Sequence, residues 1–512
     1  MARRRALRLA VLTGVAGWWW LAMPPPVAHL DLPPPPPPTS TTTAPPPVTV
    51  PTTVEASCHP PPLAARPLIA DDPSTLSQLI AVAAFSCPPA VVVATSDAAI
   101  PVAVELASTL QSPLLLGEDL AMVEATAAHL GVQRIYLLGE ARWSSWLKIV
   151  PLTEVEARRI AAAPDDEPVG PVPRDTVWLA LDGDPRWAAP VQAAAAARGE
   201  EVVLVERGDL PGSPRTVAVV RRLNPTLVVA AGPFDPEALE WQLPALVAAA
   251  ELPGGGLTLF PHRRLVAFYG NPLSPNLGVL GRQGPEETLE RLQPEAAAYA
   301  AEGLLTVPAF EIIATVASAG PGADGNYSEE MEPETLRPWI ELAGDRGVYV
   351  VLDLQSGRTD FLTQARRYEE FLRLPHVGLA LDPEWRLGPD QVHLRQVGTV
   401  DAAEINTVVE WLRDLVRREN LPQKLLLLHQ FKLSMITNRE SIDTPAELAV
   451  VIQMDGQGPL GSKFGTYSII TADAADVSWR WGWKNFYDLD TPLATPEEVL
   501  GLDPVPIFIS FQ

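Results

Sequence analysis

"VGLALDPEWR", residues 377–386, is an apolar run that ends abruptly in two carboxylates, Asp382 and Glu384, with an indole directly behind them. A short, continuously apolar run is typical of a strand that is buried on both faces. Seven further runs of this kind follow residue 264, at 265–271, 310–318, 348–357, 424–431, 448–458, 477–486 and 506–512. Together the runs predict eight parallel strands.

Amphipathic stretches separate several of these runs. "PEETLERLQPEAAAYAAEG" and "DAAEINTVVEWLRDLVRREN", among others, place apolar residues at intervals of three and four, as a surface helix does. Eight strands with helices between them, in about 250 residues, fit a (β/α)8 barrel of the triosephosphate isomerase (TIM) type. We therefore predict a barrel domain at 262–512, with an open doubly wound sheet as the alternative fold.

Polar residues recur where six of these strands end. Because barrel active sites are built at the carboxyl ends of the strands, we expect these side chains to share one cleft. A single acid at such a position could instead cap the following helix. The candidates are Tyr269, Asn271, Asp353, Gln355, Asp382, Glu384, His429, Gln430, Asp455, Gln457, Lys484 and Asn485.

The acids among them suggest a chemistry. On an extended strand, Asp382 and Glu384 would lie on one face, about 6.5 to 7 Å apart. Two carboxylates whose pKa values differ provide one proton donor and one ionised group, which is the division that glycoside hydrolysis needs. We predict Glu384 as the general acid, Asp382 as its support, and Asp353 or Asp455 as the second carboxylate.

The other candidates would bind the substrate. Trp385, Trp483 and Tyr269 offer flat faces on which sugar rings stack, although several tryptophans of the run at 477–486 could simply belong to the core. The predicted substrate-binding residues are Tyr269, Asn271, Gln355, Trp385, His429, Gln430, Gln457, Trp483, Lys484 and Asn485. The Asp-x-Glu of the fourth strand is similar to that of chitinase-like and lysozyme-like barrel glycosidases, over three residues and without the acidic motif that leads into their strand.

A metal is the chemical rival. Asp353, Asp382, Glu384, His429 and Asp455 could converge on a divalent ion. His429 stands alone, however, and no clustered histidines occur, so the sequence favours a site without metal or any other cofactor. No Gly-x-Ser-x-Gly elbow indicates a serine nucleophile.

The first part of the chain predicts export. Residues 1–23 have a basic beginning and an apolar stretch from Leu9 to Met23, as in a signal peptide that is either cleaved or retained as a membrane anchor. Residues 24–62 are rich in Pro and Thr and predict an extended spacer, or else a simple tail. In an exported protein the two cysteines, Cys58 and Cys87, predict a disulfide. The net charge of −24 argues against nucleic acid as a partner.

Residues 63–255 predict a parallel α/β domain of flavodoxin-like type. Strands are expected at 90–94, 113–116 and 134–138, with helices at about 99–110 and 119–130 between them. The same order returns at 177–232, offset by about 86 to 93 residues, which indicates a duplication. Neither copy has a Gly-x-Gly-x-x-Gly turn or a Walker lysine, so nucleotide binding has little support.

The first copy resembles the cell wall-binding repeat 2 family of Gram-positive surface proteins. The resemblance covers about fifty residues, with Ala94-Thr95, Asp97, "PLLL" at 113–116 and "YLLG" at 136–139 matching, while Ser96 and Glu140 replace glycines of the family pattern. It implies non-covalent attachment to wall polymers; an α/β scaffold without binding is the alternative. Taken together, the sequence predicts an extracytoplasmic, wall-associated protein whose barrel hydrolyses a glycan, or alternatively one that binds glycan or serves as structure without catalysis.

Overall fold

The computed structural model describes residues 63, 66–162, 175–206, 212–475 and 477–512. The predicted signal segment (1–23) and the spacer (24–62) lie outside these residues. None of the helices in the described part of the chain combines the length and apolar character that crossing a bilayer demands. The structure gives no support for the predicted disulfide: Cys58 is not among the described residues, and no disulfide bond occurs within them.

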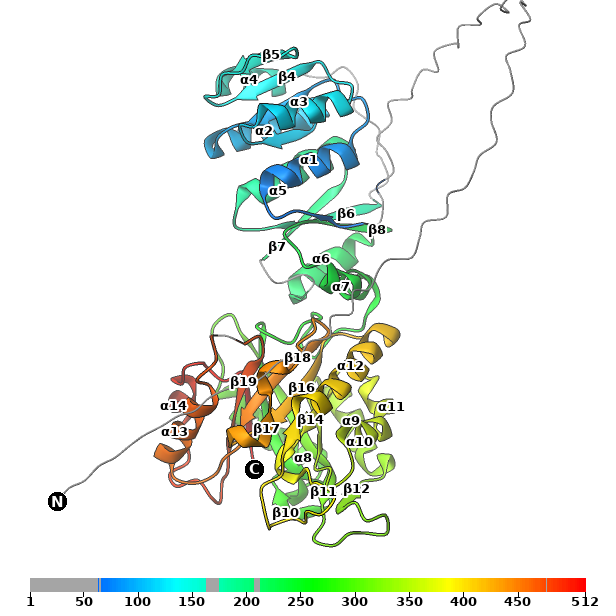
Figure 1. Ribbon diagram of the computed structural model, residues 1–512, viewed down its shortest axis with the longest axis vertical. Helices are drawn as coiled ribbons and strands as arrows, with labels where there is room; N and C mark the ends of the chain where they lie inside the picture. The colour runs from blue at the N-terminus through cyan, green and yellow to red at the C-terminus, as the bar shows by residue number, and fades with distance from the viewer. Residues whose placement is uncertain (1–62, 64–65, 163–174, 207–211, 476) are drawn as a thin grey trace, which may run out of the picture. The chain divides into compact units, whose positions relative to one another are not determined.

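The α/β region contains two four-stranded parallel sheets, as its alternating pattern predicts (Figure 1). The first has the order β3-β2-β4-β5, from β2 (Val91–Ala94), β3 (Leu114–Leu116), β4 (Arg134–Leu138) and β5 (Lys148–Leu152). The second has the order β7-β6-β8-β1, from β1 (Leu68–Ile69), β6 (Thr176–Leu181), β7 (Glu201–Val205) and β8 (Leu227–Gly232). The helices are α1 (Pro73–Ala84), α2 (Ile100–Thr109), α3 (Leu120–His129), α4 (Glu154–Ala161), α5 (Pro185–Arg198), α6 (Pro214–Leu223) and α7 (Pro236–Ala248).

The two sheets exchange their outer strands. In chain order each half begins with a strand and a helix, β1-α1 before β2 and β5-α4 before β6. Strand β1 does not join the sheet of its own half but pairs in parallel with β8, the last strand of the second half. Strand β5 pairs in parallel with β4, the last strand of the first half. The duplication is therefore reciprocal, because each half completes the sheet of the other.

The second region is a closed barrel of eight parallel strands, as predicted. Each of the eight apolar runs forms one strand: β9 (Arg263–Asn271), β11 (Leu305–Ala317), β13 (Tyr349–Leu354), β14 (Val377–Leu381), β16 (Lys424–His429), β18 (Leu448–Met454), β19 (Arg480–Asn485) and β20 (Phe508–Phe511). Pairing of β9 with both β20 and β11 closes the ring, so the alternative of an open sheet is excluded.

Helices follow most barrel strands (Figure 1). They are α8 (Pro285–Ala297), α9 (Pro333–Arg346), α10 (Phe361–Arg367), α11 (Glu369–Leu372), α12 (Ala402–Glu419), α13 (Leu460–Ile470) and α14 (Pro496–Leu500). The connection from β16 to β18 has only two 3₁₀ turns and the short strand β17 (Ile436–Thr437), which pairs with β15 (Val400–Asp401). Two short strands, β10 (Ser274–Gly278) and β12 (Ser328–Glu330), add antiparallel to β9 and β11.

Alternation along the strands separates two cores. Side chains such as Ala267, Val351 and Leu427 form an inner apolar cluster drawn from seven of the eight strands. Their immediate neighbours, such as Phe268 and Leu352, pack outward with the helices in a second cluster. Successive side chains of a strand point to opposite faces, so the residues that continue the inner series toward the carboxyl ends must also point into the barrel.

Lys424 is a charged side chain within the outer core. Lys424, the first residue of β16, is fully buried, and its Nζ donates to the backbone carbonyl of Leu374. Burial lowers the pKa of Lys424 to about 7, because the interior disfavours the ammonium form. The unfolded chain then binds the proton more tightly than the folded chain, so this lysine costs stability below about pH 7, and the cost disappears as the pH approaches the ordinary lysine pKa of about 10.4.

Replacement of this lysine by an apolar side chain should therefore stabilise the protein near neutrality. We predict that Lys424→Met raises the free energy of unfolding at pH 7, on the order of a few kcal/mol, and by much less at pH 10. Urea unfolding at the two pH values measures both differences. Lys148→Met, at an exposed lysine of β5, is the control and should change stability by less than about 0.5 kcal/mol. An equal gain at both pH values, or a loss at pH 7, would contradict the assignment.

Candidate active site at the mouth of the barrel

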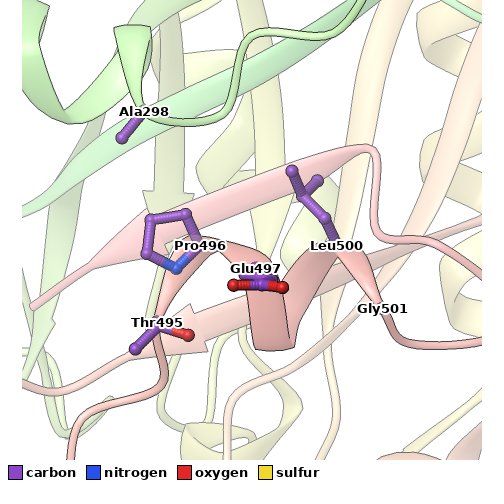
Figure 2. A pocket seen from close by; sticks show the side chains of 6 residues that line it. All are labelled: Ala298, Thr495, Pro496, Glu497, Leu500 and Gly501. Carbon is purple, nitrogen blue, oxygen red and sulfur yellow. The ribbon is translucent and has the colours of Figure 1, made fainter.

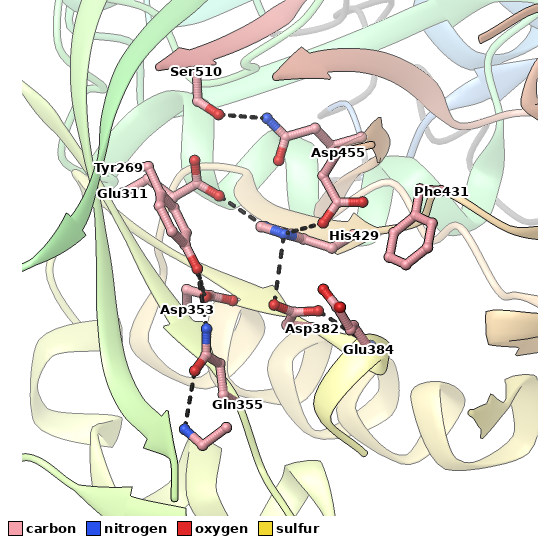
Figure 3. Close-up of polar contacts among 12 residues, drawn as sticks. Tyr269, Glu311, Asp353, Gln355, Asp382, Glu384, His429, Phe431, Asp455 and Ser510 are labelled. Carbon is pink, nitrogen blue, oxygen red and sulfur yellow. Dashed lines mark hydrogen bonds and ion pairs between the residues drawn. The ribbon is translucent and has the colours of Figure 1, made fainter. Parts of the chain in front are cut away.

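In every barrel strand the inner apolar series is followed, toward the carboxyl end, by an inward polar residue. We call this set the polar layer: Tyr269, Glu311, Asp353, Asp382, His429, Gln453, Asp455, Lys484 and Ser510. Figure 3 labels all of them except Gln453 and Lys484. All nine are buried, and they come from all eight strands or the residue just beyond a strand's end. The predicted convergence of strand-end side chains is thus found in the structure, at the carboxyl ends where barrel enzymes place their chemistry.

His429 is the centre of the polar layer. Its Nε2 lies 2.8 Å from Oε1 of Glu311, and its Nδ1 lies 3.1 Å from Oδ2 of Asp455 and 4.0 Å from Oδ2 of Asp382 (Figure 3). Burial by itself disfavours the charged imidazolium, but the surrounding acids, Asp353 foremost, outweigh it and raise the pKa of His429 well above its ordinary value. The ring joins strands that are not neighbours in the sheet.

A second network lies beside His429. The hydroxyl of Tyr269 donates to Oδ2 of Asp353 at 3.0 Å and accepts from Nε2 of Gln355 at 3.2 Å. Burial raises the pKa of Asp353 to about 6, and the nearby Glu311 adds to that rise. The ammonium nitrogen of Lys484 lies 3.3 Å from the ring centroid of Tyr269, which is a cation–π contact.

The stretch around Asp382 and Glu384 differs from the expected extended strand. Strand β14 ends at Leu381, and Pro383–Trp385 form a 3₁₀ turn in which Asp382 accepts from the backbone N–H of Glu384 at 3.2 Å. The prediction that both acids lie on one face of an extended strand is therefore wrong, because the strand ends before Asp382 and the 3₁₀ turn contains Glu384. Asp382 is nevertheless buried in the polar layer, while Glu384 is half-buried on the solvent side of that layer.

Both acids of this turn hold their protons more tightly than usual. Burial raises the pKa of Asp382 well above its ordinary value, and the acids Asp353 and Asp455 add to the rise. Burial raises the pKa of Glu384 to about 7, with repulsion from Asp455 as the next cause. Oxygens of Asp382, Glu384 and Asp455 lie within 4.8 Å of one another, so these three carboxyls form one group at the mouth.

A second set of ligand-type atoms lies deeper. Atoms of Asp353, Asp382 and His429 also lie within 4.8 Å of one another, and all three side chains are buried. Asp353 Oδ1 and Asp455 Oδ1 have no hydrogen-bond partner among the described residues. Both sets present donors of the kinds that bind divalent cations.

Two of the predicted binding residues lie near the polar layer without belonging to it. Gln355 supports Tyr269 and also accepts from the backbone N–H of Ala317 at 3.0 Å. Trp385 is half-buried, with its ring centroid 5.3 Å from that of His393.

The structure leaves other predicted binding residues outside the layer. Trp483 is fully buried and packs outward against Phe464 and Tyr467 of α13, and its indole N–H donates to Asn485 at 2.8 Å. Both follow the outward series of β19, whereas Lys484 between them points inward.

The remaining polar candidates contact neighbouring segments or are exposed to solvent. Asn271 donates to the carbonyl of Ile313 at 3.1 Å, and Gln430 accepts from Arg439 at 2.7 Å. Gln457 is exposed. Gln430 and Gln457 follow the ends of β16 and β18, beyond the regular strand, whereas Asn271 is the last residue of β9 and is bonded to the backbone of β11.

Three members of the polar layer escaped the sequence analysis: Glu311, Gln453 and Ser510. Glu311 is a lone acid inside an apolar run, which is a signal in itself. The run was read as beginning at residue 310, whereas β11 begins at Leu305, so Glu311 lies well inside the strand rather than at its start. Gln453 donates to Ser510 at 2.7 Å, which pairs two polar residues of otherwise apolar strands.

A surface hollow elsewhere does not share these features. It has a volume of about 700 Å³ and is lined by Ala298 and by residues at and beside α14 (Figure 2). Its only charged lining residue is Glu497, so it lacks the converging polar groups that mark a catalytic cleft.

Comparisons with known proteins are sparse. No protein-family model matches the chain, and no curated protein matches it. Among solved structures the chain is similar to Cwp8 from Clostridium difficile, with 12% identity and a TM-score of 0.18. That likeness covers 69% of this chain and 51% of the other, so the chain spans about half the length of that protein. A TM-score this low carries no argument about fold or function.

The placement of the tryptophans gives a prediction. Trp483→Phe should lower the free energy of unfolding by about 2 kcal/mol, because it opens a cavity against α13 and removes the hydrogen bond to Asn485, yet it should leave any binding of soluble oligosaccharides at the mouth unchanged. Trp385→Phe is the matched variant and should alter binding more than stability. Urea unfolding and calorimetric titration separate the two effects. Weaker binding by a folded Trp483→Phe protein would contradict the outward placement.

Proposed function

We propose that the protein is an extracytoplasmic, wall-associated hydrolase that cleaves a glycan at the mouth of the barrel. The observation that carries this proposal is the position of Glu384, a half-buried acid at the solvent side of a buried layer of carboxyls. Glycosidases need an acid that reaches the glycosidic oxygen and a second carboxylate beside the sugar ring.

The geometry divides the roles among the acids. Glu384 is the acid of this group that a bound sugar can reach, so we assign it the transfer of a proton to the leaving oxygen. Asp455 has an oxygen within 4.8 Å of Glu384 and is the second carboxylate, which stabilises positive charge on the sugar at the transition state. Asp382 holds the turn through its bond to the backbone of Glu384, and Asp353 lies deeper against Tyr269.

The α/β region would attach the protein to a wall polymer. Its support is the family resemblance of the stretch at 91–140 and the place where the matching residues lie. Thr95 and Asp97 line a hollow of about 260 Å³ at the carboxyl ends of β2 and β3, opposite Arg186. Open α/β sheets bind their ligands at this end of the strands.

A non-catalytic glycan-binding protein is the competing function. The observation that favours it is the completeness of burial at Glu311, Asp353 and His429, which are 0% exposed and bonded to one another or to their neighbours. A barrel of this kind could keep a polar interior for structure and bind glycan only at its rim.

Replacement of the proposed proton donor separates the two functions. Glu384→Gln should reduce the release of reducing ends from purified cell wall at least about a hundredfold, because a positioned general acid contributes that much. Its co-sedimentation with the wall should be unchanged. Glu410→Gln, at an exposed acid of α12, is the matched control and should behave as the wild type.

Two outcomes would contradict the hydrolase. If the Glu384→Gln variant releases reducing ends as fast as the wild type, Glu384 is not the proton donor. A wild-type protein that co-sediments with wall but releases nothing from wall or from defined oligosaccharides would leave the binding protein as the function.

A further inference from the structure

We propose that the barrel binds one divalent transition-metal cation between Asp353, Asp382 and His429. The proposal concerns the same mouth as the proposed hydrolysis but does not depend on a glycan being the substrate. It departs from the expectation, drawn from the sequence, of a site without metal. The three side chains come from β13, the end of β14 and β16, and their ligand-type atoms lie within 4.8 Å of one another.

The histidine is oriented as a metal ligand. Nε2 of His429 lies 2.8 Å from Glu311, and when this nitrogen donates to that carboxylate, Nδ1 turns its lone pair toward Asp382 and Asp455. Metal-binding histidines are commonly fixed in this way, by a carboxylate that accepts from the nitrogen that does not bind the metal. With its lone pair on Nδ1, the ring can keep the 3.1 Å contact with an oxygen of Asp455 only if a proton or a cation lies between the two atoms, and a cation fills that place.

Asp353 presents an open oxygen to the same place. Its Oδ2 accepts from Tyr269 at 3.0 Å, which fixes the carboxylate, while its Oδ1 has no hydrogen-bond partner among the described residues although Asp353 is 0% exposed. An oxygen that is buried without a partner costs about 1 to 3 kcal/mol or more when charged. Asp455 Oδ1, on a residue that is 8% exposed, is a second oxygen of this kind.

The balance of charge points the same way. The polar layer and Glu384 contain five carboxyl groups, whereas their basic groups are only His429 and Lys484. The ammonium of Lys484 is held over the ring of Tyr269. Buried carboxylates require a paired charge or a coordinated metal, and a divalent cation supplies two charges at the point where the acids meet.

The donor types select the cation. One imidazole nitrogen with two carboxylates suits Mn²⁺ or Zn²⁺, whereas Mg²⁺ and Ca²⁺ prefer oxygen ligands alone. We therefore expect Mn²⁺ and Zn²⁺ to bind more tightly than Mg²⁺ or Ca²⁺.

Calorimetric titration of the full-length protein tests the site without any substrate. The protein is treated with EDTA, freed of the chelator and titrated with MnCl₂ and with ZnCl₂. We expect about one cation per chain for the wild type, at least tenfold weaker binding for Asp353→Asn and for His429→Gln, and wild-type binding for Asp390→Asn, whose aspartate lies in an exposed loop. Circular dichroism checks that each variant is folded, and a rise of the wild-type thermal midpoint with 1 mM MnCl₂ supports the site even if a variant fails to fold.

Other outcomes overturn the site. Wild-type protein that binds neither cation at millimolar concentration would contradict the site, and variants that all bind as the wild type does would place the cation elsewhere. If the His429→Gln variant still binds Ca²⁺, His429 is not a ligand of the cation. Metal binding without glycan cleavage would contradict only the proposed function, and glycan cleavage by a protein that binds neither cation would contradict only the metal site.

Discussion

The closed ring of parallel strands is the constraint on which the site depends. Each strand is buried on both faces, so its side chains alternate strictly between the outer helices and the interior. Apolar residues such as Leu427 fill the interior of the barrel up to the level of the polar layer. Above these residues every strand places at least one polar side chain inward, and closure leaves these side chains no direction except toward one another. The site is therefore a consequence of alternation and closure together.

Burial then determines the electrostatics. The raised pKa values of Asp353, Asp382 and Glu384 all have desolvation as their largest cause, and the proximity of other acids is the next cause that raises them. A layer of this composition is unstable unless protons, a cation or a ligand balance its charge. Acids arranged at such a cost, at the end of a barrel where enzymes bind their substrates, favour function over structural support. The half-exposed Glu384 connects the layer to solvent.

Much of this arrangement could be predicted from the sequence, because long apolar runs report burial directly. The eight apolar runs each form a barrel strand, and six of the predicted strand-end residues converge: Tyr269, Asp353, Asp382, His429, Asp455 and Lys484. The errors arose where a local pattern does not determine direction. Pro383 ends β14 one residue before Asp382, which no count along the strand reveals, and Trp483 differs from Lys484 only by the parity of its position. The exchange of β1 and β5 between sheets depends on partners far along the chain and leaves no local signal.

The contact across the barrel between Glu311 and His429 tests the account most directly, because these residues lie on strands that are not neighbours in the sheet. A double-mutant cycle on the free energy of unfolding, with Glu311→Gln, His429→Gln and the double variant in the presence of EDTA, measures their coupling. The account predicts a coupling energy of about 1 kcal/mol or more, since contacting residues in one buried network are not independent. Additive effects, within about 0.3 kcal/mol, would show that the two side chains do not meet and that the polar layer does not exist as described.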